Sequence, residues 1–268
     1  MRAVGEGARP RTGVLLTVAY DGTPFSGFVY QPRARTVEGE LRGALAKVDP
    51  GAGRTWPASR TDAGVHASGQ LVSFDAAFPL PPRGWVLALN RHLPDEIAVR
   101  RAQLVPSGFN PRFASRWKRY RYRLLLDRVR DPHLVTRAWR LGWKIDVERM
   151  VRELDGLLGT HDFAAFRSAH DGREITVRTL HRVALERSSD PRILELVVEG
   201  SAFLYNMVRI LAGTLVDVGR VRIPPGAFLR ALRSKDRADL GETAPAHGLT
   251  LEHIEWERPD GTGDPWPG

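Results

Sequence analysis

Apolar residues in the first hundred positions alternate between the spacing of strands and that of helices. Continuous or alternating apolar runs predict strands at 13–22, 69–76 and 97–105. Between these strands, apolar side chains recur at helical spacing over 36–48, and 82–94 is a shorter helical stretch bounded by prolines. The order expected for this part of the chain is therefore β-α-β-α-β.

The second part of the chain shows the same alternation between strand and helix spacing. Strands are expected at 119–126 and on both sides of a Ser-Ser-Asp-Pro turn within 180–200. Amphipathic helices are expected at 146–159 and 202–219. Strands that run into helices in both parts predict two similar α+β halves, and not a doubly wound parallel sheet.

The two halves are expected to meet near 106–113. This junction gives an N-terminal α+β domain at 13–108 and a C-terminal α+β domain at 109–257. The remaining residues have the composition of flexible tails, at 1–12 and 258–268.

The charge of the chain favours a polyanionic partner. The 268 residues include 40 Lys and Arg against 31 Asp and Glu, a net charge of +9, and only four of the basic residues are lysines. Arginine forks suit phosphate groups, so the surplus is typical of a nucleic-acid-binding protein. A genome rich in arginine codons explains the composition equally well, so the positions of the arginines have to decide.

Several function classes are excluded or disfavoured by what the sequence lacks. The absence of cysteine excludes disulfides, thiolate nucleophiles and cysteine-ligated metals. Glycine loops for phosphate or dinucleotide binding are missing, and the histidine spacing does not favour a metal site. No apolar run reaches the ~18 residues of a membrane helix, and the N-terminus lacks a secretory core. We expect a cytoplasmic protein that needs no cofactor, metal or membrane.

The basic stretch around 112–126 alternates between two kinds of side chain. In a strand, successive residues point to opposite faces. One face then carries Lys118, Tyr120 and Tyr122, and the other carries Arg119, Arg121 and Arg123. With Arg112 nearby, this pattern indicates a strand that stacks an exposed base and holds a phosphate backbone. An exposed basic strand whose tyrosines belong to the core is the alternative.

A single acidic residue, Asp62, lies on a turn between Arg60-Thr61 and the flexible Ala63-Gly64. Arg209 lies off the apolar stripe of its helix, beside polar and small residues. A partly desolvated guanidinium needs a carboxylate from elsewhere in the chain, and Asp62 is a candidate. The alternative is that Arg209 extends to water.

Six stretches of the chain, in this order and spacing, resemble the TruA family of tRNA pseudouridine synthases. They are AYDGTPFSGF, SRTDAGVHASGQLVSFD, FNPRFASRWKRYRYRL, HDFAAFRS, FLYNMVRILAGTLVDVG and SKDRADLGETAPAHGLTL, and the resemblance covers about residues 13–256. It implies two ferredoxin- or RRM-like halves that share an extended, mostly antiparallel sheet with helices on one face. It also implies a homodimer that acts on tRNA, with uridines of the anticodon stem-loop (positions 38–40) as the expected targets.

The resemblance also assigns roles to residues of this chain. Asp62 matches the catalytic aspartate, Tyr120 the tyrosine that stacks on the target base, and Arg209 the partner of the aspartate. Arg60 matches the arginine that helps to extrude the target nucleotide. Further RNA contacts are expected from Arg112, Lys118, Arg119 and Arg121.

The sequence departs from the family pattern at two places. Ser59 stands where the family usually has glycine, and Val29 stands where it has glutamine. Both are expected near the path of the RNA, so they bear on substrate choice more than on chemistry. Two alternatives stay open: a divergent paralogue that acts on another RNA or supplies pseudouridine for biosynthesis, and a tRNA-binding or RNA-folding module without catalysis.

Overall fold

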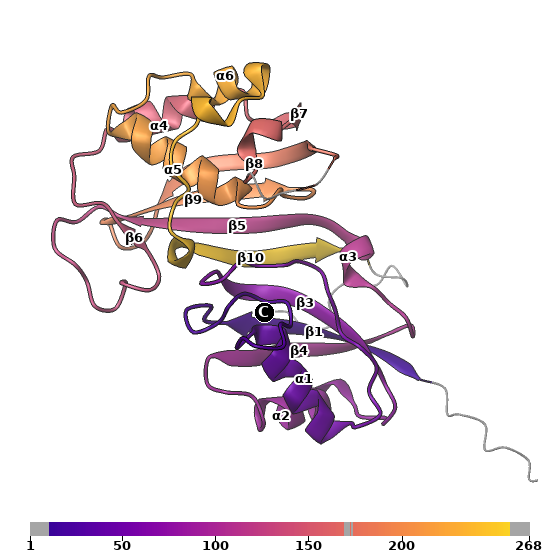
Figure 1. The fold of residues 1–268 in the computed structure, drawn as a ribbon. Helices are drawn as coiled ribbons and strands as arrows, with labels where there is room; N and C mark the ends of the chain where they lie inside the picture. The colour runs from indigo at the N-terminus through magenta and orange to yellow at the C-terminus, as the bar shows by residue number, and fades with distance from the viewer. Residues whose placement is uncertain (1–10, 169–171, 173, 258–268) are drawn as a thin grey trace, which may run out of the picture.

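One large, mostly antiparallel sheet runs through the molecule, and several helices pack on it (Figure 1). The computed structural model describes residues 11–168, 172 and 174–257. Within these residues the sheet has ten strands in the order β4-β1-β3-β10-β5-β9-β8-β7, with β2 paired to β3 and β6 paired to β5. The expected α+β class is confirmed.

The strands in chain order are β1 (Thr12–Tyr20), β2 (Trp56–Pro57), β3 (His66–Ala76), β4 (Ile97–Val105), β5 (Ser115–Leu125), β6 (Trp139–Arg140), β7 (Gly159–Asp162), β8 (Val177–Arg187), β9 (Ile193–Gly200) and β10 (Leu249–Trp256). The α-helices are α1 (Val37–Val48), α2 (Pro82–Asn90), α3 (Pro111–Ala114), α4 (Val147–Glu153), α5 (Met207–Gly219) and α6 (Ala227–Ser234). None of the helices in this part of the chain has the length and apolar character needed to cross a bilayer.

Most elements of the first half agree with the pattern of the sequence. β4 has the predicted bounds, and α1 begins after Thr36, whose side chain accepts a hydrogen bond from the Gly39 amide at 3.2 Å. β3 is longer than predicted and begins at His66. The expected tails lie almost wholly outside the described residues, although Thr12 already belongs to β1.

Two helices of the second half are shorter than predicted, each because of one backbone position. The helix expected at 146–159 ends at Glu153, and Gly156 then adopts a left-handed φ of +83°. The chain turns there and continues into β7 instead of a further helical turn. The helix expected at 202–219 begins only at Met207, because Asn206 adopts a left-handed φ of 62°.

Strand β10, which the sequence analysis did not predict, joins the two halves of the chain. It lies parallel to β3, with Thr250 opposite His66, and antiparallel to β5, with Leu249 opposite Tyr122. Residues from near the end of the described chain thus complete the sheet between the N-terminal and C-terminal strands (Figure 1). The relative position of the halves is therefore fixed by backbone hydrogen bonds.

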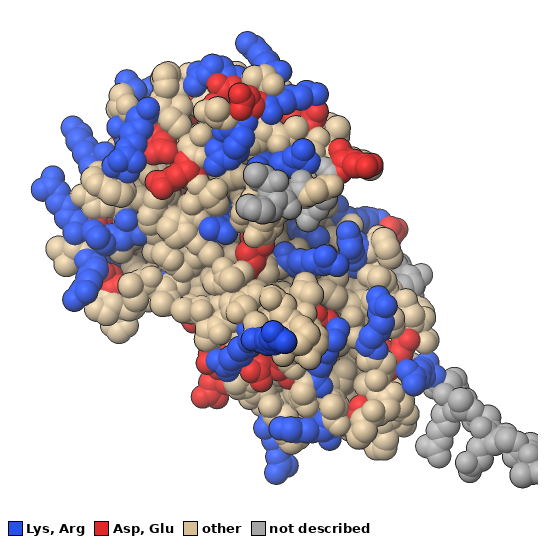
Figure 2. Space-filling view, in the orientation of Figure 1, with Lys and Arg blue, Asp and Glu red and all other residues tan. Residues whose placement is uncertain are grey.

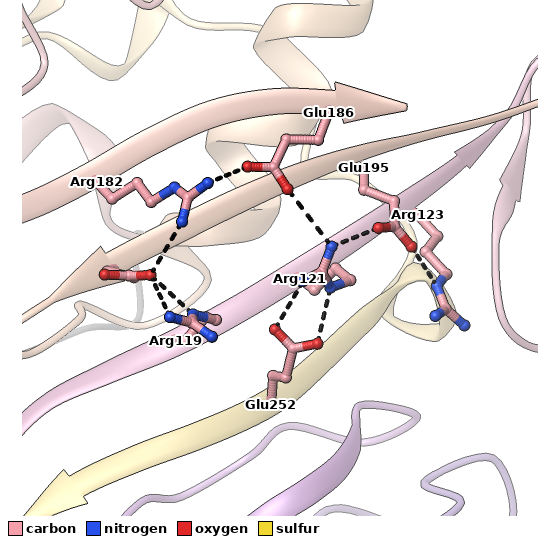
Figure 3. A network of polar contacts seen from close by, with 8 residues as sticks. Arg119, Arg121, Arg123, Arg182, Glu186, Glu195 and Glu252 are labelled. Carbon is pink, nitrogen blue, oxygen red and sulfur yellow. Dashed lines mark hydrogen bonds and ion pairs between the residues drawn. The ribbon is translucent and has the colours of Figure 1, made fainter. Parts of the chain in front are cut away.

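The two faces of β5 differ as the alternation predicted. Tyr120, Tyr122 and Leu124 are buried against the core, which includes α5. The arginines of the opposite face take part in a network with glutamates of β8, β9 and β10, which we call the Arg–Glu network (Figure 3). Its members are Arg119, Arg121, Arg123, Arg182, Glu186, Glu195, Glu199 and Glu252.

Glu195 occupies the centre of this network. It is 7% exposed and accepts hydrogen bonds from both Arg121 and Arg123. Replacement of Glu195 by glutamine would remove the carboxylate that pairs with Arg123 and one of the carboxylates that pair with Arg121, which keeps Glu252, in a partly buried place. We expect Glu195→Gln to lower the free energy of unfolding by about 2 kcal/mol, measured by urea denaturation.

The matched control is Glu96→Gln. Glu96 pairs with Arg35 at 3.2 Å, but both side chains are well exposed. An exposed pair contributes less than about 1 kcal/mol. Equal losses of stability in the two variants would show that the Arg–Glu network does not stabilise the sheet.

Candidate active site

A cavity of about 860 Å³ is lined by residues from both halves of the chain. Its wall includes the loop that carries Asp62, the middle of β5 with Tyr120, and the segment that leads into α5. Arg60, Arg112 and Lys118 also line it. On the face drawn in Figure 2, basic side chains gather at the level of β5, near α3.

The backbone around Asp62 is anchored on both sides. Before it, the Phe28 amide donates to the Thr61 carbonyl at 3.0 Å, and the Thr61 hydroxyl lies 2.7 Å from the Tyr20 hydroxyl. After it, the Val65 amide donates to the Asp62 carbonyl at 3.1 Å, and Gly64 takes a φ of +78°. The loop is therefore a rigid support for the carboxylate, with glycine where the turn needs a left-handed residue.

The side chain of Gln70 holds the backbone of Ser59, at the start of the loop that carries Asp62. Its amide nitrogen donates to the Ser59 carbonyl at 2.8 Å, and its oxygen accepts from the Ser59 amide at 3.2 Å. Gln70 is fully buried on β3, so the sheet itself holds the start of the loop. This leaves the Ser59 side chain free to point toward β5.

Arg209 lies beside Asp62, as the sequence analysis suggested. Its Nη1 is 3.8 Å from Oδ2 of Asp62. Two further contacts hold the guanidinium: Nε donates to the Ala244 carbonyl at 2.7 Å, and Nη1 donates to Oδ1 of Asn206 at 2.8 Å. The guanidinium is thus placed by neutral acceptors, and its positive charge acts on the carboxylate at short range.

The small residues next to Arg209 on α5 admit another part of the chain. A Cβ on Gly213 would lie 1.9 Å from the Glu242 carbonyl oxygen, so only glycine allows this approach. The Ala244 amide also donates to the Arg209 carbonyl at 3.1 Å. The segment that crosses α5 here continues directly into β10, so the element that joins the halves also holds Arg209.

Tyr120 is 6% exposed and its phenol reaches the cavity beside the acidic loop. Its hydroxyl lies 3.1 Å from Oγ of Ser59, and its ring meets Phe203 edge-on with centroids 5.1 Å apart. Burial raises the pKa of the Tyr120 hydroxyl to about 12, with the hydrogen bond to Ser59 opposing the rise and the charge of Asp62 adding to it. The phenol therefore stays protonated at neutral pH.

The predicted RNA contacts fall into two groups. Arg60 and Arg112 are exposed at the cavity, and Lys118 lines it while donating to the Ala58 carbonyl at 2.9 Å. Arg119 and Arg121 are not brought to the cavity, because they lie on the opposite face of β5 in the Arg–Glu network (Figure 3).

Some residues of the site were not identified from the sequence. Asn206 accepts a hydrogen bond from Arg209, and its left-handed backbone conformation stands directly before the first residue of α5. Asparagine is the non-glycine residue that most readily adopts this conformation, so its place before the helix was a usable signal. Phe203 and the contact from Ser59 to Tyr120 depend on pairing between distant segments, and local patterns carry no such signal.

An anchored carboxylate with a guanidinium beside it, a protonated phenol on the same cavity wall and basic side chains around it form an arrangement suited to catalysis on a polyanionic substrate. Among the described residues, no cluster of three His, Asp or Glu side chains could hold a metal ion. Comparison with known proteins gives the family. A family model described as tRNA pseudouridine synthase matches residues 154–257.

Curated relatives extend the match over most of the chain. The tRNA pseudouridine synthase A of Halalkalibacterium halodurans is 42% identical over 235 residues, which cover 87% of this chain and 89% of the relative. The protein of the same name from Bacillus subtilis is 40% identical over 243 residues, which cover 90% and 98%. This chain belongs to the tRNA pseudouridine synthase family, and the resemblance seen in its six motifs is confirmed.

The protonation of Tyr120 can be measured directly. Because its pKa is raised, its proton should be lost only near pH 12, above the ordinary value of 10. We expect the phenolate absorbance of the wild type and of Tyr120→Phe to coincide up to about pH 11, and the wild type to gain one more phenolate above it. An extra phenolate in the wild type at pH 9–10 would contradict the burial of this hydroxyl.

Proposed function

We propose that the protein isomerises uridine to pseudouridine in tRNA, at uridines of the anticodon stem-loop. The observation that carries this proposal is the placement of Asp62 and Tyr120 on the wall of one cavity, with the guanidinium of Arg209 3.8 Å from the Asp62 carboxylate. The membership of the chain in the tRNA pseudouridine synthase family supports the substrate.

The reaction breaks the N1–C1′ bond of uridine, turns the uracil over and forms a C5–C1′ bond. The proton on C5 is lost and N1 gains one, so no redox partner is consumed. Asp62 supplies the carboxylate that acts on the ribose, either as a nucleophile toward C1′ or as the group that stabilises or deprotonates the sugar. Both roles need the charged form, which the positive charge of Arg209 stabilises at 3.8 Å.

Tyr120 keeps the detached uracil in the cavity and assists proton transfer. Its ring closes one side of the cavity beside Phe203, where it can stack on the uracil. Its hydroxyl, protonated at neutral pH, donates a hydrogen bond or a proton at the reacting centre. Ser59 holds that hydroxyl on the side of the acidic loop.

The target nucleotide must leave its stack before Asp62 can reach the ribose, at a cost of a few kcal/mol. Arg60 is exposed at the cavity two residues before Asp62, where it can occupy the vacated place. Arg112 and Lys118 contact the phosphate backbone. In this proposal Arg119 and Arg121 stabilise the sheet and do not touch the RNA, since glutamates already pair with them.

The architecture proposed is two ferredoxin-like halves, at 13–108 and 109–257. The strand order β4-β1-β3-β2 in the first half supports it, and so does the order β10-β5-β9-β8 in the second, since each follows a β-α-β-β-α-β sequence. A homodimer in the cytoplasm, which presents two such cavities to tRNA, completes the proposal.

The test is removal of the Asp62 charge at constant size. We expect wild-type protein to convert uridine in an anticodon-arm transcript, and Asp62→Asn to form at least about 10³-fold less product. Affinity for tRNA should stay within about threefold, because the carboxylate contributes no attraction to phosphate. Mapping of pseudouridine on the transcript reports the positions.

Two results would count against the proposal. Product from Asp62→Asn at the wild-type rate would remove Asp62 from the mechanism. Absence of product with the wild type on any tRNA, despite tight binding, would favour a binding module. The matched control is Asp75→Asn, a carboxylate on β3 that does not line the cavity and should leave the rate unchanged.

A further inference from the structure

The cavity extends well past Asp62 along the N-terminal half of the chain. Its wall includes Arg54 and Trp56, which precede the catalytic loop; Trp56 is the first residue of β2, and Arg54 lies just before that strand. A smaller hollow of about 310 Å³ adjoins it and shares Arg54 and Thr55 as lining residues. The space for RNA therefore continues beyond the place of the target nucleotide.

Arg54 differs from the neighbouring Arg42 on the same wall. Arg42 pairs with the buried Glu38 at 2.7 Å and donates to the Thr55 hydroxyl at 3.2 Å, so its charge is matched within the fold. Arg54 has no carboxylate within 4 Å among the residues that the structure describes, and its guanidinium lies over the Trp56 ring, 5.4 Å from the centroid. Arg54 is therefore an exposed cation on the cavity wall that is available to an anionic ligand.

Trp56 supplies the second half of a nucleotide site. Its indole is partly exposed on the cavity wall, and pairing of Trp56 with Ser73 of β3 fixes its backbone. A flat ring with a guanidinium over one face can stack a base on the face that the guanidinium leaves uncovered and offers charge to a phosphate, the combination by which proteins hold single-stranded nucleotides. The sheet keeps this platform at a fixed position relative to the loop with Asp62, because Gln70 of β3 holds Ser59.

We propose that Arg54 and Trp56 form a second nucleotide subsite, which binds a nucleotide flanking the target in the RNA strand. Trp56 stacks on its base, and Arg54 binds its phosphate. The choice of RNA as the ligand rests on the proposed function, whereas the pairing of an unmatched cation with a ring rests on the structure alone. The subsite would add affinity next to the flipped nucleotide and fix which phosphate lies beside Asp62.

The salt dependence of tRNA affinity distinguishes the phosphate contact of Arg54 from the stacking contact of Trp56. Affinity of the full-length protein for a tRNA transcript is measured between about 50 and 200 mM salt. Loss of one phosphate contact should make the slope of log K against log salt shallower by about 0.7–0.9, which is expected for Arg54→Gln but not for Arg54→Lys. Trp56→Leu should weaken binding about 5- to 100-fold with an unchanged slope, because stacking releases no counter-ion.

Arg100→Gln is the matched control. Arg100 is an exposed arginine of β4, lies outside the cavity lining and has the same charge to lose. It should leave affinity and slope as in the wild type. Trp56→Phe keeps a ring and should bind within about threefold of the wild type.

The outcomes separate this subsite from the proposed function. Wild-type slope and affinity for Arg54→Gln overturn the subsite even if the wild type makes pseudouridine. Equal changes for Arg54→Gln and Arg100→Gln overturn it too, since they report only net charge. A wild type that makes no pseudouridine, with a slope change confined to Arg54→Gln, removes the enzyme function and retains the subsite. If Trp56→Leu fails to fold, the Arg54 variants and Trp56→Phe decide.

Discussion

The ion pair of Asp62 and Arg209 depends on the long sheet that crosses both halves of the chain. Asp62 belongs to a loop held by β1 and β3, and Arg209 belongs to α5, which packs against β5. Their charged atoms lie 3.8 Å apart, so a small shift of one half against the other would separate them. Strand β10, paired with β3 and β5, prevents that shift.

The segment before β10 strengthens this link. Its amides at Gly241 and Glu242 donate to side chains of α5, and its Ala244 carbonyl accepts from Arg209. Further along, the Pro245 carbonyl accepts from the Tyr122 hydroxyl at 2.7 Å. The His247 carbonyl lies 3.1 Å from Nε2 of His66, the buried first residue of β3. One short stretch of chain therefore connects α5, β5 and β3 around the candidate active site.

Arginines serve two purposes in this protein, and only their surroundings distinguish them. Those of the Arg–Glu network, such as Arg121, face glutamates of neighbouring strands, so their charge is cancelled within the sheet. Arg54, Arg60 and Arg112 line the cavity and have no carboxylate partner among the described residues. The positive charge of these three arginines therefore acts on the cavity.

Local patterns in the sequence predicted the elements whose partners are local. The strand at 97–105, the cap at Thr36 and the two faces of β5 follow from periodicity and capping alone. β10 alternates apolar and polar residues but was missed, because its role depends on pairing with strands far away in the sequence.

Partners that are distant in the sequence also explain why Arg119 and Arg121 were expected to contact RNA, whereas the structure places them in the Arg–Glu network. Alternation gave the direction in which their side chains point, but not the glutamates that face them from β9 and β10. For Arg209, the need of a desolvated charge for a counter-ion made Asp62 only a candidate partner, and the resemblance to the family assigned the pair that the structure shows at 3.8 Å. The contacts of Ser59 and Asn206 arise only from the assembled fold.

The role of the Asp62–Arg209 pair is tested most directly by the single-turnover rate of Arg209→Gln on tRNA, with affinity measured in the same samples. Glutamine keeps a hydrogen-bonding group but removes the charge that lies 3.8 Å from Asp62. We expect a rate at least about 100-fold below that of the wild type, with tRNA affinity nearly unchanged. A rate within threefold of the wild type would show that the pairing of Asp62 with Arg209 does not support the chemistry.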